Sequence, residues 1–488
     1  MSVSSSDSSS NLSESNAIDE TTPLLNPEDQ EPLVKETTPL PTLQLLIVCL
    51  IRIMDPISFT QIFPYVNEFI TFLKLADDPS QIGFYSGLVE STFAVTQFLA
   101  IYQWSRLSNK IGRKPVIMAG TFGVALSTIY FGLSSSLTDM LIARAIGGIF
   151  GGTASAVQSV LGEITDASNQ AEAFPIYGLV WPIGGIAGPL IGGVLSNPAD
   201  KYGSFFQNAI FHKYPYFLPC LVSGSMALSS VVFAYFFLRE TLQRKPKNGT
   251  DGREPTIREL FSIPVIRALS ISAFALHFNG TAFDALFVLF CYTPILNGGL
   301  GFSPSTIGYL LSTAGLIAAS LQVFVMPIIL KRTEASKIYN ICIAAWPIVF
   351  VTLPTLNVIA RSGIVNKPGN LGFASTSDIP LWVALIFVIA MSKIGGTAYS
   401  ITLILTRINT SSAALAVSNG LIECAMSLAR IISPALVSSI FALSQEYHLL
   451  EGHLWSLCMV CFSVTAVGLG RNISRLSQSS LTHYTRKK

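Results

Sequence analysis

The stretch RLSNKIGRKPVIMAG, residues 106–120, places Arg106, Lys110, Arg113 and Lys114 between two long apolar runs. A soluble protein could use such a cluster to bind phosphate or nucleic acid. The remaining sequence argues against this, because 50% of the 488 residues are hydrophobic and only 12% are charged, about half the usual charged fraction. The net charge of +2 is too small to indicate a polyanionic partner. We therefore expect a protein whose solvent is largely lipid and which has no nucleic-acid partner.

Apolar windows of membrane-spanning length recur along the chain. A hydrocarbon core of about 30 Å requires roughly 20 apolar residues per helix. The windows lie near 43–66, 83–104, 115–136, 139–161, 173–196 and 215–238, and then near 268–296, 306–330, 338–359, 381–405, 411–440 and 453–470. We predict an all-α integral membrane protein with twelve transmembrane helices in two six-helix bundles, 42–238 and 267–470, joined by a polar linker at 239–266.

The distribution of Lys and Arg among the loops predicts an orientation. Cations are concentrated at 105–114, 239–267, 331–337 and 471–488, whereas the alternate loops hold fewer. Because cytoplasmic loops carry the excess of Lys and Arg, we expect both termini and the linker to be cytoplasmic. The sequon at Asn248 would then lie in the cytoplasm and not be glycosylated.

The two ends of the chain predict tails rather than spans. Residues 1–41 are rich in Ser and poor in aromatic residues, so we expect a disordered cytoplasmic tail, and 471–488 is a basic cytoplasmic tail. The stretch ETTPLL (20–25) resembles an acidic dileucine sorting signal. It leaves two locations open, a vacuolar or lysosomal membrane and the plasma membrane.

Four ionisable residues lie within the predicted spans of the first half: Arg52, Asp55, Glu90 and Arg144. Each costs on the order of 3 kcal/mol in lipid, which favours a functional role. Arg52 and Asp55 are three residues apart and can pair on one helix face; the alternative is a pair that only fixes packing. Arg144 keeps its charge, so we expect Asp55 or Glu90 as its partner.

The second half carries five more such residues: His277, Asp284, Lys393, Glu423 and Arg430. His277 and Asp284 are seven residues apart and share a helix face, as do Glu423 and Arg430. Lys393 is expected to neutralise Asp284 or Glu423. His277 titrates near neutral pH in water, but a structural histidine fits the pattern slightly better than a proton carrier.

The basic stretch SRLSNKIGRKP (105–115) resembles the signature loop of the major facilitator superfamily. Two positions depart from the family pattern, since Ser105 replaces a glycine and Asn109 replaces an acid. The matching positions include Leu107, Gly112, Arg113 and Lys114, and Lys110 replaces an arginine conservatively.

Three further stretches support the resemblance. LIARAIGGIFGG (141–152) is similar to the fourth-span motif of the family, with Arg144 at its arginine. GGIAGPLIGG (184–193) resembles the fifth-span motif typical of antiporters, and PISFTQIFPY (56–65) resembles fungal relatives of the zinc-induced facilitator-like group in the twelve-span drug:proton antiporter branch. The fifth-span positions are Gly184, Gly188, Pro189, Gly192 and Gly193.

The resemblance implies a proton-coupled exporter of small organic or cationic solutes that works by alternating access. Its partners would be a small-molecule substrate, protons and the lipid bilayer, and it would act as a monomer without a metal or cofactor, driven by the proton gradient. We expect the central cavity to be lined by aromatic residues together with the charged residues of the second half: Phe63, Tyr65, Trp181, His277, Phe283, Asp284, Lys393, Glu423 and Arg430.

Two alternatives remain open from the sequence. One is a symporter or uniporter that imports a nutrient. The other is a transporter-like receptor that no longer moves solute, since Asn109 replaces the acid that holds the gating loop in the family. An enzyme is not expected, because no HExxH, GxSxG or Walker motif occurs.

Overall fold

All regular elements of the described residues are helices. The structure is a computed structural model, and it describes residues 38–75, 81–165, 169, 173, 176–242, 261–366, 379–409 and 415–485. The predictions for most of the N-terminal tail, for ETTPLL, for Asn248 and for most of the linker lie outside these residues.

The first half of the chain contains six long helical paths. They are α1 (Thr42–Arg52) with α2 (Met54–Thr60), α4 (Ile82–Ile111), α5 (Arg113–Gly132), α6 (Leu137–Gly151) with α7 (Ala154–Ile164), α9 (Val180–Leu195) and α12 (Phe217–Phe237). The short helices α3 (Val66–Phe72), α10 (Pro198–Tyr202) and α11 (Ala209–Lys213) connect them. The first path breaks after Arg52 because Pro56, four residues later, lacks the N–H that would bond the Arg52 carbonyl.

The second half repeats this plan. Its helices are α14 (Pro264–Tyr292), α15 (Pro304–Ser320), α16 (Met326–Arg332), α17 (Ala335–Asn366), α18 (Ile379–Gly396), α19 (Ala398–Asn409), α20 (Leu415–Glu446) and α21 (Leu454–Thr485). A π-helical turn at Leu321–Val325 joins α15 to α16, and α18 with α19 forms one path.

These helices confirm the predicted fold class. Eleven segments of the described residues are long and apolar enough to cross a membrane. The twelfth helix, α4, overlaps the predicted span 83–104 but is less apolar because it carries polar residues such as Glu90 and Gln97. The turn before the fourth span lies earlier than the windows predict: α5 ends at Gly132 and α6 begins at Leu137, where the Ser136 side chain caps it by accepting the Asp139 N–H.

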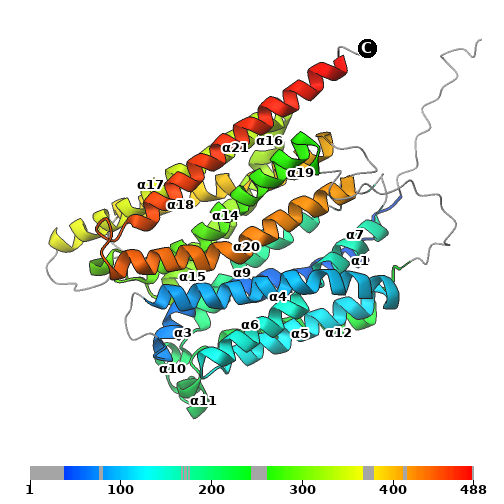
Figure 1. Cartoon of the computed structure of the whole chain (residues 1–488). Helices are drawn as coiled ribbons and strands as arrows, with labels where there is room; N and C mark the ends of the chain where they lie inside the picture. Colours follow the sequence, from blue (N-terminus) through cyan, green and yellow to red (C-terminus); the bar gives the residue numbers. More distant parts are fainter. Residues whose placement is uncertain are drawn as a thin grey trace, which may run out of the picture.

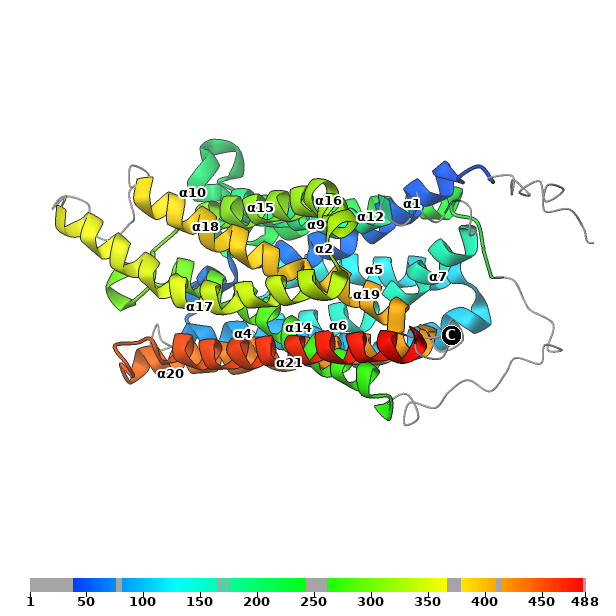
Figure 2. The ribbon, with the colours of Figure 1, turned by 90° about the horizontal axis from the view of Figure 1, so that it is seen from above.

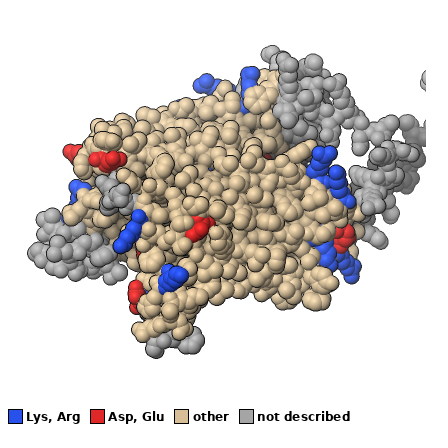
Figure 3. All heavy atoms as spheres, turned by 60° about the horizontal axis from the view of Figure 1, so that its bottom comes forward, with Lys and Arg blue, Asp and Glu red and all other residues tan. Residues whose placement is uncertain are grey.

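The two six-helix groups lie side by side, the first half below and the second above in Figure 1, and Figure 2 shows them from a second direction. They touch mainly through α4 with α20 and α9 with α15. In Figure 3, Lys and Arg lie mostly towards the two ends of the visible face, while most of the surface between the ends carries neither sign. We name the end that holds Arg113 and Lys114 the basic end, and the opposite end, which holds Tyr292 and Pro304, the far end.

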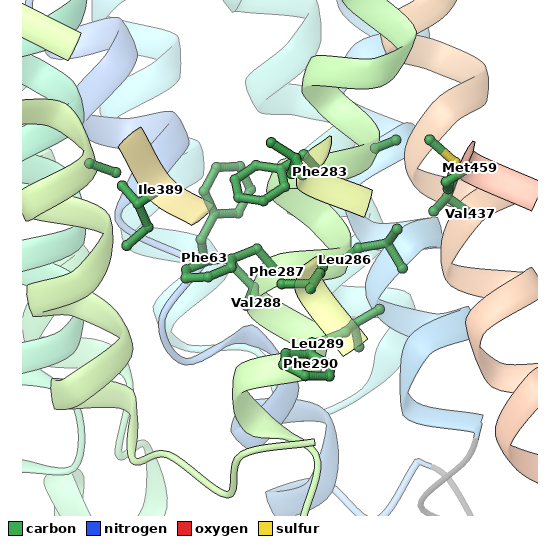
Figure 4. Close-up of a cluster of buried hydrophobic side chains, with 14 of the residues drawn as sticks. Phe63, Phe283, Leu286, Phe287, Val288, Leu289, Phe290, Ile389, Val437 and Met459 are labelled. Carbon is green, nitrogen blue, oxygen red and sulfur yellow. The ribbon is translucent and has the colours of Figure 1, made fainter. Parts of the chain in front are cut away.

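One buried apolar cluster crosses the boundary between the halves. Figure 4 shows Phe63 of the first half in the same cluster as Phe283, Phe287 and Val437 of the second. The halves are therefore joined by apolar packing as well as by backbone contact.

Candidate functional site

The basic end is organised around a turn at Gly112. The predicted loop 105–114 is wrong in its extent, because α4 continues to Ile111 and α5 begins at Arg113. Gly112 adopts φ 114°, a backbone angle that residues with a Cβ rarely adopt. A single glycine therefore makes the reversal between the two helices.

Glu240 caps the start of α5. Its carboxylate accepts the Arg113 N–H at 2.8 Å and the Lys114 N–H at 3.1 Å. Partial burial raises the pKa of Glu240, but the backbone N–H groups of Arg113, Leu242, Lys114 and Thr241 outweigh this and hold its pKa below the usual value. Glu240 belongs to the stretch FLRETL (237–242), but the sequence did not indicate that it would cap this helix.

Arg113 ties three helices together at the same end. It donates to Glu163 of α7 from Nε at 3.1 Å and Nη2 at 2.9 Å, and from Nη1 to Ser108 at 3.0 Å and Asn109 at 2.6 Å. Asn109, which replaces the family's acid, thus still binds the neighbouring arginine. Glu163 was not predicted from the sequence. The remaining predicted loop positions, Ser105, Leu107 and Lys110, lie outside this network of described contacts.

The fifth-span glycines of α9 pack on the first span. A Cβ at any of three of them would collide with α2 or the residue after it, so only glycine permits this approach. Pro189 lies among them, buried within the same helix. The pairs are Gly184 with Pro56, Gly188 with Thr60, and Gly192 with the Gln61 carbonyl.

Gly193 differs from the other glycines because it faces the second half. A Cβ there would meet the Pro304 carbonyl and Gly308 of α15. Its own carbonyl accepts bonds from Ser305 Oγ at 3.0 Å and Lys201 Nζ at 2.9 Å. The motif thus joins the first span to α9 and α9 to the other half.

Arg52 and Asp55 form the predicted ion pair, a charge-assisted hydrogen bond between Arg52 Nη1 and Asp55 Oδ2. Both side chains are largely buried, at 17% and 21% exposure. Asp55 is therefore already neutralised within its own span.

Arg144 does not form the predicted ion pair. Its guanidinium lies over the Phe93 ring at 4.4 Å and near Phe59 at 5.7 Å, and Nε donates to the Val89 carbonyl at 3.3 Å. Nη2 is buried without a hydrogen-bond partner. Glu90, next to Val89, is 7% exposed and close enough for its charge to interact with Arg144, but no hydrogen bond or ion pair of Glu90 is found among the described residues.

The charged residues of the second half form two pairs. Lys393 Nζ lies 3.5 Å from Asp284 Oδ1, which decides between the two predicted partners of Lys393. Arg430 Nη2 lies 3.7 Å from Glu423 Oε1. Both distances exceed those of a close charge-assisted bond, and the acids are about half exposed, at 46% and 52%.

The predicted aromatic lining is partly wrong for this conformation. Tyr65 is fully buried, where its hydroxyl donates to Gln61 and contacts Cys220, and Phe283 is buried against Phe287. Phe63 is buried in the shared cluster. Hydrophobic periodicity within a single span cannot distinguish aromatic residues that are buried between helices from those that line a cavity, because both kinds lie on apolar helices.

Trp181, another predicted lining residue, is partly exposed and lies close to aromatic residues that were not predicted. The Trp181 side chain is 48% exposed, and its ring centroid lies 6.4 Å from that of Phe59. The Phe59 ring centroid in turn lies 5.5 Å from that of Phe93. Phe59 and Phe93 were missed by the sequence analysis, although Phe59 lies in the quoted stretch PISFTQIFPY. His277 is within 6.3 Å of the Tyr399 ring.

Comparison with known proteins identifies a single family along most of the chain. A model described as "Major Facilitator Superfamily" matches residues 48–434. The chain is 35% identical to the major facilitator-type transporter psiT2 of Psilocybe cyanescens, over 90% of this chain and 92% of that protein. It is 30% identical to the efflux pump azaK of Aspergillus niger, over 87% of this chain and 88% of that protein.

Two further likenesses agree with this result. The chain is 27% identical to Protein ZINC INDUCED FACILITATOR 1 of Arabidopsis thaliana, over 83% of this chain and 85% of that protein. Its fold matches a solved bacterial homologue of the human lysosomal transporter Spinster with a TM-score of 0.68, at 18% identity, over 91% of this chain and 98% of that one.

Proposed function

The chain belongs to the major facilitator superfamily, and from this premise we propose that it exports small organic solutes, cationic ones included, in exchange for protons. It is a multi-pass membrane transporter and not an enzyme. The relative named as an efflux pump and the antiporter-like packing of α9 on the first span support export.

The main support for proton coupling is the environment of the Glu90 side chain. Asp55 is bound to Arg52, so loading a proton there would first break an ion pair. Glu90 is buried beside Arg144 without such a bond among the described residues, so no ion pair has to break before it takes up a proton. We assign the proton to Glu90 and a structural role to Asp55.

The contacts between the halves support a state that is closed at the far end. Gly83, Gly87 and Ser91 of α4 touch α20, and Gly193 touches α15, all in the far-end part of these helices. Positions nearer the basic end, such as Gly420, have no atom near the place of a Cβ. If the basic end is cytoplasmic, as its cations indicate, this is the cytoplasm-open state, in a vacuolar, lysosomal or plasma membrane.

A flux assay tests this proposal. The purified chain is reconstituted into vesicles with an imposed pH gradient, and uptake of ethidium, a permanently charged organic cation, is followed by fluorescence. We expect gradient-driven flux in the wild type, loss of gradient dependence in Glu90→Gln, and retained coupling in Asp55→Asn. Glu334→Gln, an exposed acid at the start of α17, is the control.

Three outcomes would oppose the proposal. Flux that ignores the gradient in the wild type removes proton coupling. Flux that follows the proton's direction, rather than opposing it, replaces export by symport. Coupling lost in Asp55→Asn but kept in Glu90→Gln moves the proton to Asp55.

A further inference from the structure

The segment between α9 and α12 leaves the bundle and returns to it. It contains α10, a 3₁₀ turn at Gly203–Phe206 and α11. Its two ends meet, because the Asn197 N–H donates to the Pro215 carbonyl at 2.8 Å. In Figure 1, α10 and α11 lie at the side of the bundle near the far end, while α17 and α20 reach further along the helix direction, and Figure 2 shows the same for α10. We name residues 197–215 the far-end projection.

Side chains of α10 fix the far-end projection to the end of α9. Lys201 Nζ donates to the Gly193 carbonyl and to Ser196 Oγ, both at 2.9 Å. The Tyr202 hydroxyl donates to the Val194 carbonyl at 2.8 Å. Both carbonyls belong to the last turn of α9, where the helix itself supplies no N–H partner for them. The projection is therefore held at a set place beside a membrane-spanning helix.

The far-end projection presents apolar side chains that the bundle does not cover. Ile210 of α11 is 44% exposed and Tyr202 of α10 is 46% exposed. A row of rings runs from Tyr202 to the spans, with centroid separations of 6.1 Å for Tyr202 and Phe206, 5.4 Å for Phe206 and Phe211, and 6.5 Å for Phe211 and Phe217. Phe217 is the first residue of the membrane-spanning helix α12. The apolar surface of the projection is therefore continuous with that of the spans.

The charge available on the far-end projection is positive. His212 and Lys213 end α11, and both side chains are exposed. Lys213 Nζ lies 5.2 Å from the centroid of the Tyr214 ring. The acid of the projection, Asp200, already accepts a hydrogen bond from Asn197 Nδ2 at 2.7 Å. A ligand of this surface would therefore meet exposed cations beside apolar side chains.

A bilayer surface fits this combination better than a soluble partner. Segments that lie in the membrane interface place apolar and aromatic side chains at the acyl boundary and cations near the lipid phosphates. The projection lies beside the spans near their far ends, where the surrounding solvent changes from lipid tails to headgroups. A protein partner would have to displace lipid to reach the same face.

We infer that the far-end projection is a membrane anchor that binds phospholipid of the leaflet at the far end, with Ile210 and Tyr202 at the acyl boundary and Lys213 at an anionic headgroup. The inference goes beyond the proposed function, since it holds for any transported solute. The anchor adjoins the contact between the halves, because the Gly193 carbonyl that accepts Lys201 also accepts Ser305 Oγ of the second half.

A tryptophan reporter tests the depth of the anchor. The full chain with Ile210→Trp is placed in lipid nanodiscs, and its extra emission over the wild type is followed with two quenchers, aqueous iodide and phosphatidylcholine brominated near the headgroup end of its acyl chains. We expect the brominated lipid to remove most of the extra emission and iodide to remove little. Asn297→Trp, at an exposed polar position of the far end, is the control and should respond to iodide instead. Because both variants carry the same ring, the comparison separates location from the preference of Trp for interfaces.

A second measurement tests the contact of Lys213 with lipid. In Ile210→Trp, the quencher is either brominated phosphatidylglycerol, which is anionic, or the same small share of brominated phosphatidylcholine. We expect stronger quenching by phosphatidylglycerol, because Lys213 attracts anionic lipid to the reporter. Adding Lys213→Gln should abolish this preference. Adding Lys337→Gln, which removes an exposed lysine paired with Glu334 at the start of α17, should leave it unchanged.

Three results would overturn the inference. Quenching of Ile210→Trp by iodide but not by brominated lipid places the projection in water, where its apolar face would fit a soluble partner or a second copy of the chain. Equal quenching by the two brominated lipids removes the contact with anionic lipid. A preference for phosphatidylglycerol that survives Lys213→Gln assigns that contact to another cation. None of these measurements uses transport, so their outcome does not depend on the proposed function.

Discussion

At the scale of single residues, Asn109 keeps a contact with Arg113 although it replaces the family's acid. The family pattern has an acid at this position, but the Asn109 amide oxygen still accepts from Arg113 at 2.6 Å. Arg113 receives its charge partner from Glu163 instead. The basic end is therefore held together by an acid that the signature loop does not contain, which weakens the case for a receptor that has lost its gate.

Asn109→Asp should stabilise the first half and alter the transport rate. The new carboxylate would bind Arg113 more strongly than the amide does, by about 1 kcal/mol. Its position in the last turn of α4 costs about 0.3–1 kcal/mol against the helix dipole, so the net gain is small. Thermal unfolding and ethidium flux check this, with Asn109→Leu as the opposite change. Unchanged stability and kinetics would show that the replacement is silent.

Glu240→Gln tests the cap on α5 through its dependence on pH. Because the pKa of Glu240 is lowered on folding, its contribution to stability is present above the unfolded value of about 4.3. It is lost as the pH falls through the folded value. We expect the variant to unfold at a lower temperature than the wild type at pH 7 and at the same temperature near pH 3. A difference that persists in acid would point to a role other than the charge.

At the scale of helices, the packing of α9 decides what the fifth-span motif does. The spacing of Gly184, Gly188 and Gly192 predicts a helix face without side chains, and in the structure that face packs against α2. The sequence could not predict that Gly193, one residue further, faces the other half. Helix periodicity orders positions around one axis, but it does not say which neighbour each position meets.

Gly192→Ala should destabilise the protein, whereas Gly185→Ala should not. An added Cβ at Gly192 collides with the Gln61 carbonyl, while the same atom at Gly185 meets nothing within 4 Å. Overpacking of this kind costs about 1–3 kcal/mol, so the unfolding temperature of Gly192→Ala in detergent should drop. Equal unfolding temperatures for the two variants would mean that α9 and α2 are not in close contact.

At the scale of the whole molecule, the twelve spans follow from sequence because lipid imposes a length and an apolar composition on each. The site follows less completely. The sequence reveals the acidic and basic residues of the spans because burying each one in lipid costs free energy. Two of the predicted pairs are present in the structure, Arg52 with Asp55 and Lys393 with Asp284. The position of Arg144 over Phe93 depends on how α4 and α6 pack, which no single-span pattern contains.

Alternating access predicts that the far-end contact between the halves must open during transport. A Cβ at Gly83 would lie 3.7 Å from the Cβ of Ala442, within the range of a disulfide, about 3.5–4.5 Å. The double variant Gly83→Cys with Ala442→Cys should therefore cross-link α4 to α20 on oxidation. It should then stop ethidium flux, and reduction should restore the flux.

The single variants, oxidised in the same way, give the control, because the native cysteines are free and common to all. Failure to cross-link would mean that α4 and α20 do not meet at Gly83. Full flux in the cross-linked protein would mean that the halves need not separate there. The pathway would then have to open through α9 and α15, where Gly193 meets Gly308, and a cross-link between those two helices should block it instead.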